Sequence, residues 1–593
     1  MLYPIRNYYR SFIEINDFWK FKVDKEEKGF GKKWFNGFES SLEIAVPGSW
    51  NEQLEELGLL HYIGSVWYSK RIFIPAEFSE KRIVIRIGSA DYNSKLWING
   101  KLVGENYSGF LPFEFEITNF VSPGEYANLV LWVNNKLSDS SIPQGIESDY
   151  YQRENRLREE TYPAARFDFT PFGGINRPVI VYSTPKNFIS KLQIQTSIEG
   201  KKNGTLNVKT EAITDQSYEI DYSIENVKIS AEEISYDSAC SSTARLKIKD
   251  CRFWSPEDPF LYSLNVKLKV NKAIIDEYSL PIGVREIELV KNKLMLNGKE
   301  IYMKGFGKHE DFPVTGKGLF LPQIVKDFEL LKWINANSFR TSHYPYSDEI
   351  LSYADRKGIL IINEVPAVSL DFRYVNGDTL QNHKESLLRL IERDNNHPSV
   401  IAWAAGNEPN LVGEPSYYDG RGKKYWGEIF NYVRSLDQSR PITVPNCSRA
   451  GIDDPVFEFC DFISLNRYYG WYEYPGQMER AVDILSKEMD LIYSKYKKPV
   501  MFTEFGVDTI PGSHSTSDQM FTEEYQSKYL QEYIKLFRSK KYMIGEHVWN
   551  FADFRTPQHF RRVVMNLKGV FTRDRSPKLA AFKLKEIWKN SSE

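Results

Sequence analysis

The N-terminal part of the chain carries short runs in which apolar and polar positions alternate, the pattern of half-buried β-strands. Residues 83–87 and 128–133 are β-branched or apolar runs of strand length. Asn99-Gly100 separates two further apolar runs, and this dipeptide favours a hairpin because both central residues of the turn need positive φ angles. No amphipathic helix longer than a turn or two interrupts the pattern. We therefore predict a two-sheet β-sandwich over residues 1–185.

The alternation continues beyond Pro185. Positions that share one face of a predicted strand are Leu206, Val208, Thr210 and Ala212 in one run, and Leu264, Val266, Leu268 and Val270 in another. About 100 residues of short alternating strands is the size of an immunoglobulin-like sandwich. We assign this second domain to residues 186–288.

From residue 289 onward, apolar runs of strand length alternate with helical patterns. The candidate strands are residues 302–306, 338–340, 359–363, 400–405, 442–444, 462–465, 500–503 and 544–549. Between the second and third of them, Ser347 is a candidate N-cap and Gly358 a candidate C-terminal stop for a helix. Eight β/α units in about 300 residues predict a (β/α)8 TIM barrel, which we assign to residues 289–593.

Composition excludes several classes of protein. The 593 residues contain 77 Lys and Arg against 79 Asp and Glu, so the chain lacks the basic excess of a nucleic-acid-binding protein. No apolar run approaches the ~18 residues of a membrane span. Residues 1–20 are interrupted by Arg6, Arg10, Glu14 and Asp17 and lack the apolar segment of a secretory signal, so we expect a cytoplasmic protein.

No cofactor or metal is expected either. The four cysteines form no CxxC pair, no spacing of His, Asp and Glu compels a metal site, and there is no Gly-rich phosphate loop. Aromatic residues make up 15% of the chain. Most of them belong to protein cores, but aromatic faces also stack on sugars.

Two glutamates follow apolar barrel strands directly: Glu408 after residues 400–405 and Glu504 after residues 500–503. Active sites of (β/α)8 barrels lie at the carboxyl ends of the strands, so these two carboxyl groups are expected to face the same cavity. Glycoside hydrolysis needs such a pair, one carboxyl protonated and the other ionised. A single carboxylate there is equally well explained by a helix start, but two of them, with Asn407 adjacent, favour catalysis.

At this point the chain resembles the family 2 glycoside hydrolases. Asn407-Glu408-Pro409 and Thr503-Glu504-Phe505-Gly506 are similar to the acid/base and nucleophile segments of that family. Further matching segments, in order along all three predicted domains, are Val46-Pro47-Gly48-Ser49-Trp50, Trp254-Ser255-Pro256-Glu257-Asp258-Pro259 and Arg340-Thr341-Ser342-His343-Tyr344-Pro345. The resemblance implies that the first sandwich is a sugar-binding-like jelly roll.

Within the family the resemblance is to β-glucuronidases, because Asn566-Leu567-Lys568 matches the N-x-K element with which they bind the sugar carboxylate. The chemistry of the residues agrees: a buried uronate needs a cation and hydrogen-bond donors, which Lys568 and Asn566 offer, and Arg562 could add a second charge. The remaining substrate-binding positions that the resemblance implies are Asp168, His309, Arg340, His343, Asn407, Asn466, Tyr468, Tyr472 and Trp549. Among them, Asn407 would hold the sugar 2-hydroxyl, Arg340 would keep Glu504 ionised, and His309, His343 and Trp549 would line the pocket.

The sequence therefore predicts a retaining exo-β-glucuronidase that hydrolyses terminal β-D-glucuronides through a covalent glycosyl-enzyme, with Glu408 as acid/base and Glu504 as nucleophile. A retaining pair implies carboxyl groups about 5–5.5 Å apart. The resemblance implies a homodimer or a homotetramer. The segment 367–383 is short for this family, which implies an open active site. A β-galacturonidase, a neutral-sugar enzyme (β-galactosidase or β-mannosidase) and a non-hydrolytic carbohydrate-binding protein remain alternatives.

Overall fold

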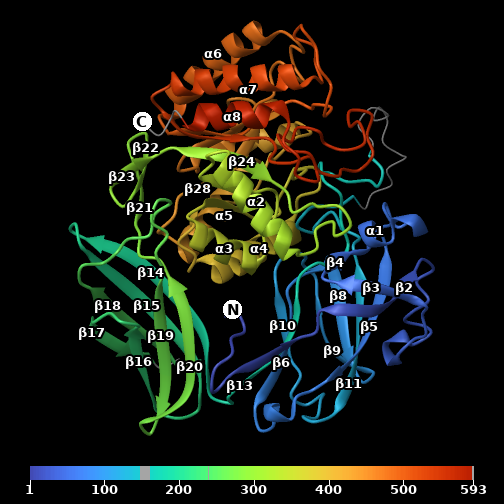
Figure 1. Cartoon of the computed structure of the whole chain (residues 1–593), viewed down its shortest axis with the longest axis vertical. Helices are drawn as coiled ribbons and strands as arrows, with labels where there is room; N and C mark the ends of the chain where they lie inside the picture. The colour runs from blue at the N-terminus through green and yellow to red at the C-terminus, as the bar shows by residue number, and fades with distance from the viewer. Residues whose placement is uncertain (147–160, 238–239, 590–593) are drawn as a thin grey trace.

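The computed structural model describes residues 1–146, 161–237 and 240–589. Two β-sandwiches lie side by side below a barrel of strands and helices (Figure 1). The first sandwich is drawn in blue, the second in green, and the barrel in yellow to red. The three predicted architectures are therefore present in the predicted order, whereas the exact boundaries at 185/186 and 288/289 stay predictions.

The N-terminal domain is a jelly-roll-like sandwich of a six-stranded sheet (β3-β2-β5-β11-β8-β9), a four-stranded sheet (β1-β13-β6-β10) and a three-stranded sheet (β4-β12-β7). Its elements are β1 Ser11–Glu14, β2 Asp17–Asp24, β3 Leu42–Val46, β4 Gly48–Ser49, α1 Trp50–Gln53, β5 Ser65–Phe73, β6 Arg82–Ile87, β7 Ala90–Asp91, β8 Asn93–Ile98, β9 Lys101–Asn106, β10 Phe113–Glu116, β11 Tyr126–Asn134, β12 Gly174–Ile175 and β13 Val179–Thr184. The predicted hairpin is confirmed: β8 and β9 pair antiparallel across Asn99 (φ 49°) and Gly100 (φ 78°).

The second domain packs a four-stranded sheet (β14-β15-β18-β17) on a three-stranded sheet (β16-β19-β20), as expected for an immunoglobulin-like sandwich. Its strands are β14 Phe188–Glu199, β15 Asn203–Ile213, β16 Tyr218–Ile224, β17 Ile229–Tyr236, β18 Ser241–Ile248, β19 Tyr262–Val270 and β20 Ala273–Ile282. The alternation read from the sequence is the inward face, since Leu264, Val266 and Leu268 are buried in one core with Leu206 and Val208.

A small sheet closes the bottom of the barrel. Its strands are β21 Ile287–Val290, β22 Lys293–Leu296 and β23 Lys299–Ile301. Leu294 and Leu296 pack with Trp254 against residues that begin barrel strands, such as Met303 and Leu360. The end of the barrel that receives the chain from the second sandwich is thus filled with apolar side chains, and the opposite end is left for the site.

The barrel strands are β24 Met303–Lys308, β25 Ser338–Thr341, β26 Leu360–Glu364, β27 Val400–Ala404, β28 Ile442–Thr443, β29 Pro445–Cys447, β30 Ile463–Asn466, β31 Val500–Glu504 and β32 Met543–Val548. They pair in parallel in the order β28-β27-β26-β25-β24-β32-β31-β30-β29. β28 matches the predicted fifth strand at residues 442–444, and β29 continues the chain beyond Val444, so the two ends of this strand order are joined by one continuous segment. Each of the eight predicted strands is present to within about two residues.

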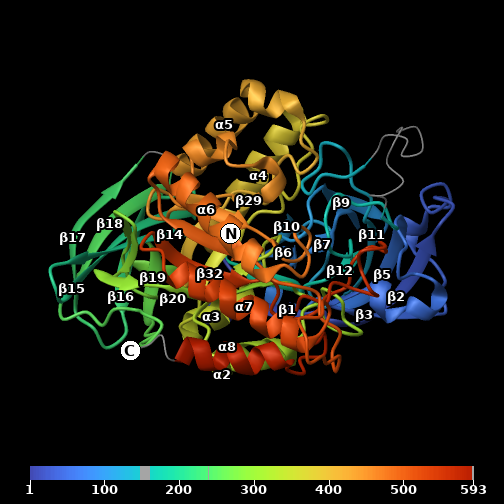
Figure 2. The ribbon, with the colours of Figure 1, turned by 90° about the horizontal axis from the view of Figure 1, so that it is seen from above.

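The helices of the barrel are α2 Leu321–Trp333, α3 Asp348–Lys357, α4 Gly377–Asp394, α5 Gly422–Leu436, α6 Met478–Tyr496, α7 Glu523–Arg538 and α8 Leu579–Lys589. They surround the strands, as the view from above shows (Figure 2). The predicted limits of α3 are confirmed: Ile350 N donates to the Ser347 hydroxyl, and Gly358 ends the helix at φ 70°. None of the helices in the described part of the chain combines the length and apolar character needed to cross a membrane.

The segment between β11 and β12 joins the jelly roll to the mouth of the barrel. Thr170 N donates to Arg555 O at 3.1 Å, and Arg166 forms an ion pair with Asp371 at 2.6 Å. This segment carries Asp168. A residue of the first domain is therefore brought to the carboxyl ends of the barrel strands.

Candidate active site

A cavity of about 570 Å³ lies at the carboxyl ends of the barrel strands. The predicted site residues that line it are Asp168, His343, Asn407, Glu408, Asn466, Tyr468, Tyr472, Glu504, Trp549 and Arg562. Four others, His309, Arg340, Asn566 and Lys568, do not line it and are at most 4% exposed. The structure thus gathers the predicted residues at one place, with some of them one layer below the cavity surface.

Glu504 is the last residue of β31 and is 4% exposed. One of its carboxylate oxygens accepts from Arg340 Nη2, and the other accepts from the Tyr468 hydroxyl at 2.6 Å. Both donors favour the ionised form. Glu504 is therefore oriented by two charged or polar partners before any substrate is present.

Glu408 lies just beyond β27 and has a different environment. Its carboxylate accepts from the neutral amide Nδ2 of Asn466 at 2.9 Å. Its main chain has φ 47°, a left-handed conformation that is costly for a residue with a side chain and is frequent at functional sites. Its side-chain donor is thus a neutral amide, whereas Glu504 accepts from a guanidinium and a hydroxyl.

Two amides connect the two glutamates. Asn407 Oδ1 accepts from Asn466 Nδ2 and from Arg340 Nη1, both at 3.3 Å. The Thr503 hydroxyl donates to Asn466 Oδ1 at 2.7 Å. These contacts fix which end of the Asn466 amide faces Glu408.

Glu364, at the end of β26, contacts two of the residues that lie beside Glu504. It accepts from Arg340 Nη1 at 2.5 Å and contacts His343 Nδ1 at 2.7 Å. His343 Nε2 then lies 3.8 Å from Glu504. Because Arg340 is shared by Glu364 and Glu504, its guanidinium is held in one orientation.

The pKa values of these carboxyls follow from burial and from a shortage of cations. Burial raises the pKa of Glu504 to about 8, against the opposing effect of Arg340, and the charge of Glu408 raises it further. Burial likewise raises the pKa of Glu408, and that of Glu364 to about 7. Arg340 contacts Glu504 as expected and opposes the rise in its pKa, although burial has the larger effect.

Aromatic rings form one wall of the cavity. His343 stacks on Trp549 with ring centroids 5.0 Å apart, and burial lowers its pKa well below the ordinary value, so it is neutral. His309 lies behind Trp549 against Phe554, 4.2 Å between centroids, rather than on the cavity surface. Phe505 directly follows Glu504 in the sequence but is fully buried, stacked on Tyr533, and does not line the cavity.

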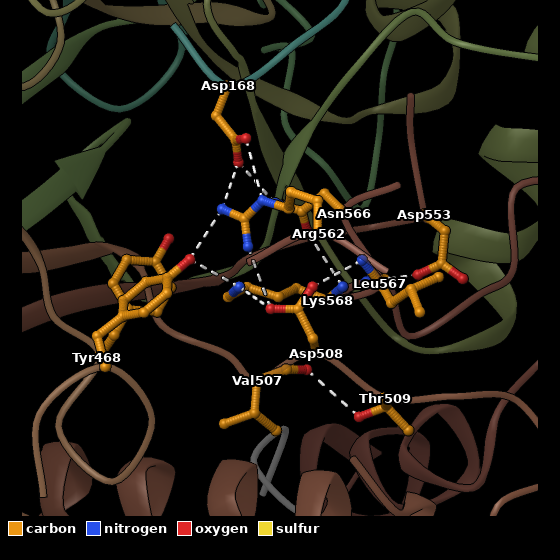
Figure 3. Close-up of polar contacts among 12 residues, drawn as sticks. Asp168, Tyr468, Val507, Asp508, Thr509, Asp553, Arg562, Asn566, Leu567 and Lys568 are labelled. Carbon is orange, nitrogen blue, oxygen red and sulfur yellow. Dashed lines mark hydrogen bonds and ion pairs between the residues drawn. The ribbon is translucent and has the colours of Figure 1, made fainter. Parts of the chain in front are cut away.

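A second polar cluster contains the predicted carboxylate-binding residues (Figure 3). Arg562 donates to both carboxylate oxygens of Asp168, from Nε at 3.0 Å and from Nη2 at 2.5 Å, and Asn566 Nδ2 donates to Asp168 at 2.9 Å. Lys568 Nζ donates to the Tyr472 hydroxyl at 2.9 Å and forms an ion pair with Asp508. The cluster thus holds two cations, of which Arg562 lines the cavity and Lys568 lies directly beneath it.

Asp508 was missed by the sequence reasoning, although it lies only four residues beyond Glu504. Its carboxylate accepts from Leu567 N at 2.8 Å as well as from Lys568 and, at 3.3 Å, from Arg562. A lone aspartate in a loop gives no signal in the sequence, because its partners lie about 60 positions away. Among the described residues, no group of three or more His, Cys, Asp or Glu side chains is arranged to hold a metal ion.

Family models match the whole architecture. The TIM barrel domain of the glycosyl hydrolases family 2 matches residues 287–592, the sugar binding domain matches residues 12–185, and the remaining family 2 model matches residues 187–285. The chain belongs to family 2 of the glycosyl hydrolases. The predicted family and the predicted three-domain fold are thereby confirmed.

Several relatives that span the full length of the chain are β-glucuronidases. The β-glucuronidase of Paenibacillus borealis is 36% identical, covering 100% of this chain and 99% of the relative, and that of Homo sapiens is 35% identical, covering 100% and 93%. The structure of the Ruminococcus gnavus β-glucuronidase in complex with D-glucuronic acid is similar with a TM-score of 0.91, at 35% identity over 99% of both chains. A β-glucuronidase from an uncultured Clostridium sp. has a TM-score of 0.89, at 36% identity over 100% of both chains.

Proposed function

We propose that this family 2 enzyme is a retaining exo-β-glucuronidase acting on terminal β-D-glucuronides. The observation that carries the proposal is the position of Tyr468 between two clusters. Its hydroxyl donates to Glu504, and its ring centroid lies 5.7 Å from Lys568 Nζ. The carboxylate pair therefore lies on one side of Tyr468, and the two cations lie on the other, with Arg562 at the cavity surface and Lys568 directly beneath it. A sugar with a reacting C1 and an anionic C6 requires such an arrangement. The β-glucuronidase relatives support the same substrate.

The sugar would bind with its carboxylate toward Arg562, Lys568 and Asn566 and with its anomeric carbon beside Glu504. A guanidinium, an ammonium and an amide offer the charge and the donors that a desolvated carboxylate needs. Asn566 and Lys568 are 0% and 1% exposed, so the protein beneath this end of the cavity is closely packed. A sugar whose carboxylate points into packed protein would be a terminal one, which is the basis of the proposed exo action.

In the first chemical step, Glu408 donates its proton to the glycosidic oxygen while the Glu504 carboxylate attacks the anomeric carbon. The C1–O bond to the aglycone breaks and a C1–O bond to Glu504 forms. In the second step, Glu408 removes a proton from water, the water oxygen attacks C1, and Glu504 leaves as a carboxylate. Arg340 and Tyr468 would stabilise the charge that returns to Glu504, and Asn407 would contact the sugar 2-hydroxyl.

The substrate assignment is tested with p-nitrophenyl β-D-glucuronide, β-D-galacturonide and β-D-galactoside on the wild type and on Lys568→Ala. We expect the wild type to favour the glucuronide. Lys568→Ala should lower kcat/KM for both uronides by about 30-fold or more, the cost of removing one partner of a buried charge pair, and should spare the galactoside. If Lys568→Ala hydrolyses the glucuronide as well as the wild type does, carboxylate recognition by Lys568 is refuted. If the wild type prefers the galacturonide or the galactoside, that sugar is the substrate instead of the glucuronide.

The stereochemical claim needs a separate measurement. Proton NMR of the first turnovers should show β-glucuronic acid appearing before the α anomer, because two displacements at C1 restore the starting configuration. Initial formation of the α anomer would make the enzyme inverting.

A further inference from the structure

Two buried aspartates hold the backbone of the loop that carries Asn566 and Lys568. Asp508 accepts from Leu567 N at 2.8 Å, and Asp553 accepts from Gly569 N at 2.9 Å. Each also pairs with a buried lysine, Asp508 with Lys568 and Asp553 with Lys578 at 2.8 Å. All four side chains are at most 2% exposed. The loop is therefore fixed by two ion pairs that are alike in burial and in backbone contacts.

The two pairs differ in what their lysines face. Lys578 Nζ also donates to two backbone carbonyls, Thr509 O and Leu567 O, both at 3.0 Å. Lys568 Nζ instead contacts the hydroxyl of Tyr472, a residue that is 43% exposed and lines the cavity. Only the Asp508 pair thus connects the loop to the substrate cavity.

Asp508 also reaches the second cation of the cluster. Its Oδ2 atom accepts from Arg562 Nη1 at 3.3 Å as well as from Lys568 Nζ, so one carboxylate oxygen lies between the two cations (Figure 3). Lys568 Nζ is further surrounded by the rings of Tyr472 and Trp471, at 4.7 and 5.3 Å from their centroids. An ammonium in such an enclosure needs a fixed counter-charge, and Asp508 supplies it.

Asp168, the other carboxylate of the cluster, has a different character. Its side chain is 45% exposed, it comes from the jelly-roll domain, and it contacts Arg562 and Asn566. A sugar carboxylate that uses Arg562 and Asn566 must compete with Asp168 for the same donors. Asp508 is buried beneath Lys568 and remains in place, so it is the permanent counter-ion of the pocket.

We propose that Asp508 is a specificity-determining positioning residue, which holds Lys568 and Arg562 at the place where they meet the carboxylate of a uronide. The proposal rests on the proposed glucuronidase function. Without Asp508, Arg562 keeps Asp168 as an anionic partner, whereas Lys568 loses its only buried anionic partner among the described residues. The ammonium then moves, and the recognition of C6 is lost while the reacting pair is unchanged.

The test compares Asp508→Asn with Asp553→Asn as the matched control, on p-nitrophenyl β-D-glucuronide and β-D-glucoside. These two substrates differ only at C6. Asp508→Asn should lower the ratio of kcat/KM for glucuronide to that for glucoside by about tenfold or more, through KM. Asp553→Asn should change both substrates alike and leave the ratio within about twofold. The Ki of D-glucuronate should rise in parallel in Asp508→Asn.

A double-mutant cycle distinguishes action through Lys568 from a general structural effect. In a Lys568→Ala background, adding Asp508→Asn should lower kcat/KM for the glucuronide by less than about threefold. Additive losses, or an unchanged ratio and an unchanged Ki in Asp508→Asn, would overturn the proposal. If Asp508→Asn does not fold, Asp508→Glu keeps the charge and moves it by one methylene; it should lose glucuronide activity selectively, and equal loss on both substrates would count against the role.

A failure of this inference is distinguishable from a failure of the proposed function. A wild type that prefers the neutral glucoside refutes glucuronidase activity itself. A wild type that prefers the glucuronide, combined with an Asp508→Asn variant that keeps that preference, refutes only the role of Asp508.

Discussion

The buried carboxyl groups at the two ends of the cavity have pKa values shifted in opposite directions. At the reacting end, Arg340 pairs with Glu364 and Glu504, and burial raises the pKa of both carboxyls and of Glu408. At the basic end, burial also raises the pKa of Asp508, but Lys568 and Arg562 outweigh it, so the pKa lies below the ordinary value. The ratio of cations to carboxylates, rather than burial alone, decides whether a site keeps a proton or a permanent charge.

The comparison extends to the loop below the basic end. Asp553 has one cationic partner, Lys578, and burial raises its pKa to about 7. Asp508 has two cationic partners and its pKa is lowered. Proton storage suits the general acid Glu408, and permanent charge suits the recognition of an anion. The nucleophile Glu504 must instead give up its proton, which its contacts with Arg340 and Tyr468 favour.

The largest expected effect lies at the reacting end. Glu504→Ala and Glu408→Ala should each reduce kcat on p-nitrophenyl β-D-glucuronide by roughly 10³-fold or more, because each removes a group that acts in the chemical step. Both should lower activity on every substrate, unlike Lys568→Ala, which should act on uronides. Steady-state kinetics measure this. Full activity in Glu504→Ala would show that Glu504 is not the nucleophile.

A smaller effect is expected for Glu364→Gln. The substitution removes the charge that holds Arg340 and His343 beside Glu504, so kcat should fall by about tenfold to a hundredfold with little change in KM. Glu546→Gln is the matched control, since Glu546 is also a fully buried glutamate of a barrel strand. It accepts from Tyr302 and Trp588, at 2.9 and 2.8 Å, on the outer side of the barrel. Equal losses in both variants would show that Glu364 acts only on folding.

The smallest expected effect is a shift of the pH profile. Because the charge of Glu408 raises the pKa of Glu504, the two carboxyls titrate as a pair. Glu408→Gln removes that charge, so the pKa of Glu504 should fall and the acid limb of kcat/KM should move to lower pH. An aryl glucuronide with an activated leaving group, which needs no acid, allows the measurement. A limb that stays in place or moves to higher pH would contradict the coupling.

Much of the fold could be predicted from the sequence because the patterns that indicate it involve neighbouring residues. The turn at Asn99-Gly100, the alternation in β19 and the caps at Ser347 and Gly358 each depend on a few adjacent residues, and each is present as predicted. The site was partly readable for a related reason. In a parallel barrel all strands end at the same mouth, so Glu408 and Glu504 could be brought together from their positions after β27 and β31 alone.

The sequence by itself therefore determined the three domains, the barrel strands and the residues at their ends. The tertiary structure decided how deep those residues lie and which charges they meet. Asp168 reaches Arg562 across 394 positions from another domain, Lys568 lies beneath the cavity surface on Asp508, and Phe505 turns into the core. Periodicity reports the local backbone, but burial and counter-charge arise where loops from different elements converge, and these set the pKa values on which the chemistry depends.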